Sequence, residues 1–79
     1  MEIKILGPGC RNCEALVKTV KEALAELNQE AEVEKITDMD KILEHDILMT
    51  PGLVINGVVI AFGRVPKKNE IVNWIKQEI

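Results

Sequence analysis

Along the 79-residue chain, apolar residues form short strand-like runs in some segments and recur at helical spacing in others. Residues 3–6 form a short β-prone run that ends at the loop-forming Gly7-Pro8-Gly9. From Cys10 onward apolar side chains recur at helical spacing, with mostly charged residues between them. These apolar positions are Cys13, Leu16, Val17, Val20, Leu24 and Leu27. The pattern predicts a strand over 3–6, then a long amphipathic helix that opens near Cys10 and ends around Asn28 and Gln29.

The middle of the chain predicts a second strand and a shorter helix. Apolar side chains over 31–36 alternate roughly with charged ones, as in a half-buried strand. Thr37 or Asp38 is placed to cap the helix that follows, and Thr50-Pro51-Gly52 ends it. We expect the buried stripe of this helix to consist of Met39, Ile42, Leu43 and Ile47.

The last third of the chain predicts a β-hairpin and a final helix. Asn56-Gly57 separates apolar runs at 53–55 and 58–62, and this dipeptide suits a two-residue turn in which both positions need positive φ. After Pro66 the spacing of Ile71, Val72, Ile75 and Ile79 is helical again, with Trp74 beside them. The predicted order is β-α-β-α-β-β-α, an α/β protein.

Length and charge restrict the organisation and the partners. A chain of 79 residues is expected to be one domain, 1–79, and a monomer. A net charge of −3 without a lysine or arginine cluster argues against nucleic acid and against an anionic membrane surface. Gly7-Pro8-Gly9 comes too early for the apolar stretch of a signal peptide, so we expect a cytoplasmic protein.

The candidate chemistry lies in Cys10-Arg11-Asn12-Cys13. Cysteines three residues apart in the first turn of a helix can face one another and close a disulfide. Free N–H groups and the helix dipole favour a thiolate on the first of them, at sites where thiol pKa values reach about 3.5–7.5. Cys10 is therefore the predicted nucleophile. Cys13 lies on the apolar stripe and is predicted to resolve the mixed disulfide.

Two other interpretations of the cysteine pair stay open at this point. As a structural crosslink it would close a loop of only four residues, which stabilises a fold by roughly 2 kcal/mol at most. As a metal site the pair supplies two of about four ligands, and His45, the only histidine, sits among acidic residues near the end of the second helix. Zinc or Cu(I) could still be bound if another chain completed the site.

The chain resembles the thioredoxin and glutaredoxin superfamily, and in particular its small prokaryotic thioredoxin-like members. The resemblance rests on the Cys-x-x-Cys after the first strand, Thr50-Pro51 before the third, the Asn56-Gly57 hairpin, and Gly63 before the last helix. It implies a four-stranded mixed sheet flanked by three helices, with the strands in the spatial order second, first, third, fourth. It also implies a thiol–disulfide oxidoreductase that needs no cofactor beyond its redox-active disulfide.

The resemblance further implies a substrate site beside the cysteines. In the superfamily the proline before the third strand is cis and faces the cysteine pair, which implies the same for Pro51. The Thr50 backbone would then pair with an extended substrate, and Gly63 would permit close approach. Lys35 matches a lysine on the second strand of many thioredoxins. Gly9 and Arg11-Asn12 replace the usual tryptophan and Gly-Pro, so the family's redox potential is not carried over.

The implied partners follow from dithiol exchange. The substrates would be protein or small-molecule disulfides, and a reductase or a low-molecular-weight thiol would restore the reduced pair. The chain has no nicotinamide or flavin fingerprint, so the electrons must come from outside. An adaptor with vestigial exchange chemistry and a module that delivers a thiophilic metal remain the rival interpretations.

Overall fold

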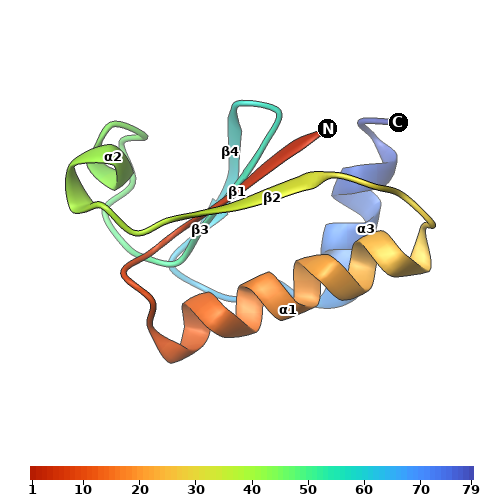
Figure 1. Cartoon of the computed structure of the whole chain (residues 1–79), viewed down its shortest axis with the longest axis horizontal. Helices are drawn as coiled ribbons and strands as arrows, with labels where there is room; N and C mark the ends of the chain where they lie inside the picture. Colours follow the sequence, from red (N-terminus) through yellow and green to blue (C-terminus); the bar gives the residue numbers. More distant parts are fainter.

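The seven predicted elements are present and in the predicted order in a computed structural model that describes all 79 residues (Figure 1). The strands are β1 (Glu2–Leu6), β2 (Glu32–Ile36), β3 (Gly52–Ile55) and β4 (Val58–Phe62). The helices are α1 (Arg11–Glu26), α2 (Met39–Leu43) and α3 (Lys68–Lys76). None of these helices is long and apolar enough to cross a membrane.

The strands form one four-stranded mixed sheet in the order β2-β1-β3-β4, as expected. β1 and β2 are parallel because α1 carries the chain back along the sheet between them, whereas β1–β3 and β3–β4 are antiparallel. The predicted hairpin turn joins β3 to β4, with φ values of 50° at Asn56 and 82° at Gly57. The sheet therefore presents the C-terminal end of β1 beside the start of β3.

Two helices cover one face of the sheet and the third covers part of the other (Figure 1). The larger core cluster joins α1 and α3 to inward-facing residues of β1 and β3, among them Ile3, Ile5, Leu53 and Ile55. A smaller cluster packs Ile42 of α2 against the opposite face of the sheet. The face with α2 is the less extensively covered one.

Both ends of α1 follow from local sequence. Cys10 is the N-cap residue, so the helix begins directly after the first cysteine. At the other end Asn28 adopts φ 52°, and the Gln29 N–H bonds to the Leu24 carbonyl at 3.0 Å. Asparagine tolerates this left-handed conformation better than most residues, so the helix ends where the sequence predicts, within two residues.

The predicted buried stripe of α2 is partly wrong. The helix ends at Leu43, and Met39 and Leu43 are 52% and 56% exposed. Ile42 and Ile47 are buried as expected, but Ile47 lies beyond the helix, after a turn in which Asp46 adopts φ 58°. The one-and-a-half turns of α2 bring only Ile42 onto the sheet. Ile79 is likewise exposed, because α3 ends at Lys76.

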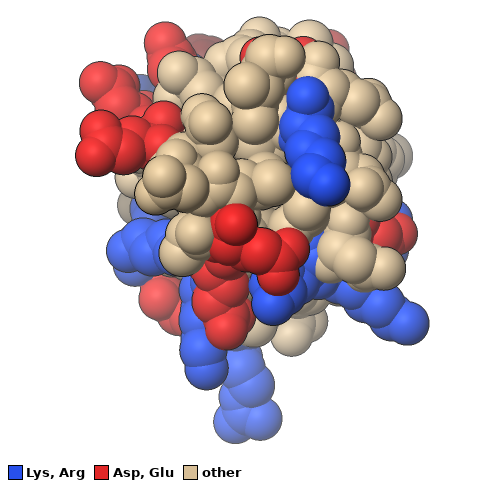
Figure 2. Space-filling view, turned by 90° about the vertical axis from the view of Figure 1, so that its right-hand side faces the viewer, with Lys and Arg blue, Asp and Glu red and all other residues tan.

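Charge is interspersed at the end of the molecule that carries both chain termini. Figure 2 shows basic side chains projecting from the lower part of this end with acidic ones among them, and an upper part that is mostly tan apart from one basic side chain and acidic groups at its left edge and top. One ion pair, Lys68 Nζ to Glu26 Oε1 at 3.3 Å, links α3 to the last turn of α1. The cysteines lie at the opposite end of α1.

Candidate active site

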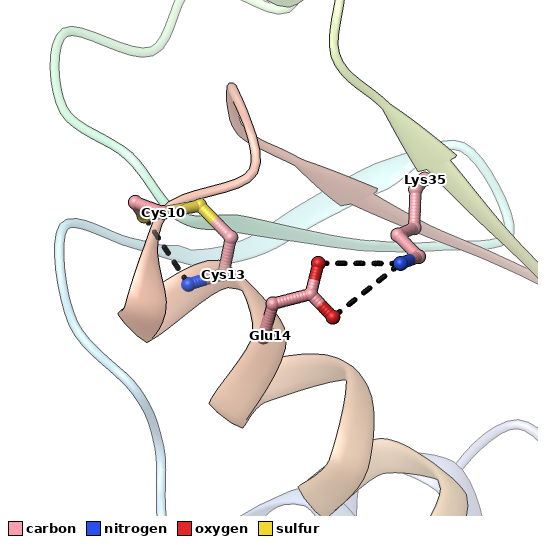
Figure 3. The surroundings of a disulfide bond; sticks show 4 residues. All are labelled: Cys10, Cys13, Glu14 and Lys35. Atoms are coloured by element: carbon pink, nitrogen blue, oxygen red, sulfur yellow. Dashed lines mark hydrogen bonds and ion pairs between the residues drawn. A yellow bond between two sulfur atoms is a disulfide. The ribbon is translucent and has the colours of Figure 1, made fainter.

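Cys10 and Cys13 form a disulfide at the start of α1 (Figure 3). Their Cα atoms are 5.0 Å apart, and the Cys13 N–H also donates a hydrogen bond to Cys10 Sγ at 3.2 Å. Cys10 has extended backbone angles as the N-cap, while Cys13 is already helical. Because the backbone changes from extended at Cys10 to helical at Cys13, the two sulfur atoms face each other.

The two sulfurs lie in different surroundings. Cys10 is exposed, whereas Cys13 is 4% exposed. The difference follows from the apolar stripe of α1, which places Cys13 in line with Leu16 and Val17 on the face that packs against the sheet. Cys10 is therefore the more accessible cysteine of the pair.

The first turn of α1 leaves backbone donors beside Cys10. The N–H groups of Arg11 and Asn12 make no hydrogen bond to any backbone carbonyl or side chain in the protein. Such unpaired N–H groups carry the positive end of the helix dipole. An anionic sulfur at the N-cap is therefore better stabilised than one elsewhere on the surface.

Gly7 contributes to the site by lacking a side chain, which sequence reasoning missed by treating it as part of a loop. A Cβ at this position would overlap Cys13 Sγ and would lie 3.3 Å from Cys13 Cβ and 3.8 Å from Thr50 Cβ. The Gly7 N–H continues the β1–β2 ladder by bonding to the Ile36 carbonyl at 2.9 Å. The buried sulfur of Cys13 thus occupies the space of an absent side chain, next to Thr50.

The loop before β3 lies against this same position. The Thr50–Pro51 peptide bond is cis, as the resemblance implies, and Pro51 is buried. The Thr50 N–H and C=O make no backbone hydrogen bond, and its side chain makes none either. The structure therefore brings Thr50 beside Cys13 with its backbone polar groups unpaired.

Gly63 lies next to Pro51 through backbone pairing. Its N–H donates to the Pro51 carbonyl at 2.9 Å, and its φ of 80° favours glycine. A Cβ at this position would come within 3.2 Å of Met49 Cβ, so the turn and the loop before Pro51 are in close contact. All five residues predicted for the site, Cys10, Cys13, Thr50, Pro51 and Gly63, thus fall on three neighbouring segments.

A charged pair follows this turn. Arg64 Nη1 lies 3.1 Å from Glu70 Oε2, which also accepts the Lys67 N–H at 2.8 Å. Two hydrogen bonds lower the pKa of Glu70 below its ordinary value of 4.5. The bond from the Arg64 side chain has the larger effect and the bond from the Lys67 backbone the smaller one. These contacts fasten the segment after Gly63 to the start of α3.

No third metal ligand accompanies the cysteines. The protein contains no group of three or more His, Cys, Asp or Glu side chains placed to hold a metal ion. The His45 Nδ1 atom lies 2.9 Å from the Lys41 carbonyl, on the last turn of α2. A thiophilic metal at Cys10 and Cys13 would need ligands from a second molecule.

An exposed cysteine at a helix N-cap, a buried partner three residues on and an adjoining cis-proline loop on this sheet define a thioredoxin-like dithiol protein. Residues 1–76 match the family model described as thioredoxin domain. The chain belongs to the thioredoxin family and is a thiol–disulfide oxidoreductase.

Curated relatives agree with this assignment. A thioredoxin of Methanothermobacter thermautotrophicus is 48% identical over 71 residues, which cover 90% of this chain and 92% of the relative. A thioredoxin of Methanocaldococcus jannaschii is 36% identical, over 94% of this chain and 85% of the relative. A second Methanothermobacter thermautotrophicus protein, named probable thioredoxin, is 33% identical over 92% of this chain.

Proposed function

We propose that the chain reduces protein disulfides, with Cys10 as the attacking sulfur and Cys13 as the resolving sulfur. The observation that carries this division is the contrast in burial: Cys10 is exposed at the N-cap of α1, and Cys13 is 4% exposed beneath it. The Cys13 N–H, 3.2 Å from Cys10 Sγ, and the unpaired N–H groups of the first turn favour a thiolate on Cys10.

The reaction proceeds in two exchanges. The Cys10 thiolate attacks one sulfur of the substrate disulfide, that bond breaks, and the other substrate sulfur leaves as a thiolate that takes a proton from water. Cys13 then loses its proton and attacks Cys10 Sγ, which expels the second substrate sulfur and forms the Cys10–Cys13 bond. Two electrons pass to the substrate. A protein reductase or a low-molecular-weight thiol returns the pair to the reduced form.

Thr50, Pro51 and Gly63 are proposed to hold the substrate. The unpaired N–H and C=O of Thr50 can pair with an extended peptide in the manner of an added strand. Two exposed apolar side chains, Leu48 and Met49, directly precede Thr50 and can contact apolar side chains of that peptide. The site therefore suits an extended or locally unfolded segment around the substrate cysteine.

The compartment is proposed to be the cytoplasm. Both cysteines of the chain belong to the exchange site, so the protein has no separate structural disulfide of the kind that marks proteins of oxidising compartments. A reducing compartment would also supply the thiols that recycle the pair.

Insulin reduction tests the assignment of the nucleophile. With dithiothreitol as electron donor, the parent is expected to accelerate insulin reduction, and Cys10→Ser to abolish the acceleration. Cys13→Ser leaves the attacking sulfur intact and serves as the matched variant, since it still forms a mixed disulfide but does not resolve it. Acceleration by Cys10→Ser equal to that of the parent would refute the assignment.

A further inference from the structure

The charge around the cysteines differs in sign from the charge of the whole chain. Three segments meet at the site: residues 7–13, 47–52 and 62–65. They contain two basic residues, Arg11 and Arg64, and no acidic residue. The chain as a whole has a net charge of −3. The part of the surface that would receive a substrate is therefore locally basic on an acidic protein.

Acidic side chains next to these segments in the chain do not offset the charge of Arg11. Glu14, on the first turn of α1, is paired with Lys35 Nζ at 3.2 Å, so these two residues add no net charge. Glu44 and Asp46 belong to the turn that follows α2, and this helix packs against the opposite face of the sheet.

The two arginines differ in what they contact. Arg11 directly follows Cys10, is exposed, and makes neither an ion pair nor a side-chain hydrogen bond. Arg64 is also exposed but lies 3.1 Å from Glu70, which offsets part of its charge. Lys67, whose backbone N–H donates to the same carboxylate at 2.8 Å, brings a second cation to this group. Both places are therefore positive, and Arg11 has its full charge and all its donors free.

We propose that the site selects disulfides whose reacting cysteine has acidic side chains beside it, with Arg11 and Arg64 as the residues that determine this specificity. The proposal rests on the proposed function, because it names a substrate class for the same exchange. A segment that pairs with Thr50 brings its cysteine to Cys10, so the neighbouring substrate residues come close to both arginines. Carboxylates at those positions are attracted and ammonium groups are repelled, which changes the rate of productive encounter.

Two peptide disulfides test the proposal, identical except that the cysteine is flanked by Glu in one and by Lys in the other. The measured quantity is the rate of mixed-disulfide formation on Cys10 in reduced Cys13→Ser. Each rate is divided by the rate of 2-mercaptoethanol with the same peptide, which corrects for the peptide's own reactivity. We define the acidic preference as the ratio of the two corrected rates. At low ionic strength it is expected to be about fivefold.

Further substitutions in the Cys13→Ser background separate recognition from reactivity. Arg11→Gln is expected to lower the acidic preference to about twofold, and Arg11→Lys to keep most of it. Arg64→Gln should lower it less, and Glu70→Gln should raise it, because Arg64 then loses its intramolecular partner. Any effect of Arg11 on the Cys10 thiolate acts on both peptides equally and cancels in the ratio.

The matched control is Lys76→Gln, at the end of α3 and at the end of the molecule away from the cysteines. It removes the same charge from an exposed position and is expected to leave the acidic preference unchanged. The net charge of −3 by itself would favour the basic peptide, so an acidic preference has to come from charges at the site.

An acidic preference that falls with Arg11→Gln, rises with Glu70→Gln and disappears in about 1 M salt supports the proposal. Equal corrected rates, a basic preference, or an equal loss with Lys76→Gln overturns it, while trapping on Cys10 would still support the proposed nucleophile. If neither peptide forms an adduct on Cys10, the proposed function is refuted and this inference with it.

Discussion

The substitution Gly7→Ala tests how the fold makes room for the buried sulfur. Gly7 has no positive φ, so alanine introduces no backbone strain there. Its methyl group would, however, overlap Cys13 Sγ and lie 3.3 Å from Cys13 Cβ. In the disulfide form Cys13 Sγ is tied to Cys10 and cannot turn away, whereas in the reduced form the thiol is free to change rotamer. Alanine should therefore destabilise the oxidised protein more than the reduced one.

The size of the effect follows from two opposed contributions. Overpacking a buried site costs about 1–3 kcal/mol. Replacing glycine by alanine at an unstrained position recovers about 0.4–1 kcal/mol, because the unfolded chain loses conformational freedom. We expect a net loss of about 1–2 kcal/mol in the oxidised form and less than about half of that in the reduced form. A difference of about 1 kcal/mol between the two forms corresponds to a reduction potential about 20 mV less negative.

Urea unfolding of the oxidised and reduced proteins measures this difference, and equilibration with glutathione checks it independently. Gly9→Ala is the matched control, since a Cβ at Gly9 meets nothing within 4 Å while its φ of 93° strains alanine. That control should destabilise both redox forms equally and leave the potential unchanged. If Gly7→Ala destabilises the oxidised and reduced forms by the same amount, Cys13 Sγ does not fill the space beside Gly7.

Two further predictions concern contacts that hold the segments around the site. Because Arg64 lowers the folded-state pKa of Glu70, this carboxylate stabilises the fold above about pH 4.5. The contribution is lost as the pH falls through the folded-state pKa. Glu70→Gln should therefore lower the urea midpoint at pH 7 and match the parent near pH 2. Asp38 caps α2 by accepting the Asp40 N–H at 2.9 Å, so Asp38→Ala should cost about 1 kcal/mol by urea unfolding, whereas Asp40→Ala, which removes no cap, should cost less than half as much.

The sequence predicts those features of the fold that depend only on neighbouring residues. Asn56-Gly57 predicted its hairpin because few other dipeptides adopt positive φ at two successive positions, and the structure has φ 50° and 82° there. The apolar period of α1 predicted the burial of Cys13, because it places this residue on the same helix face as Leu16 and Val17. Prediction of the cis bond before Pro51 depended on the family resemblance, since a peptide bond before proline is usually trans.

Features that depend on tertiary contact were missed. Met39 and Leu43 fit a helical stripe, but α2 ends too soon to bring them onto the sheet. The space beside Gly7 exists because α1 returns Cys13 to the end of β1, and the spacing of apolar residues does not predict that contact. Lys35 matches a lysine of the family, but its partner Glu14 lies 21 residues away on another element, so spacing along the chain does not predict the ion pair. The signal that could have found Gly7 is a glycine directly after a strand and before the cysteine pair.

The central claim, that Cys10 attacks and Cys13 resolves, is tested most directly by trapping the mixed disulfide. Reduced Cys13→Ser and reduced Cys10→Ser are each incubated with a peptide disulfide, and the adducts are located by mass spectrometry of proteolytic fragments. The exposure of Cys10 and the burial of Cys13 predict a stable adduct on Cys10 in Cys13→Ser and little or none on Cys13 in Cys10→Ser. An adduct that forms on Cys13 as fast as on Cys10 would contradict the account.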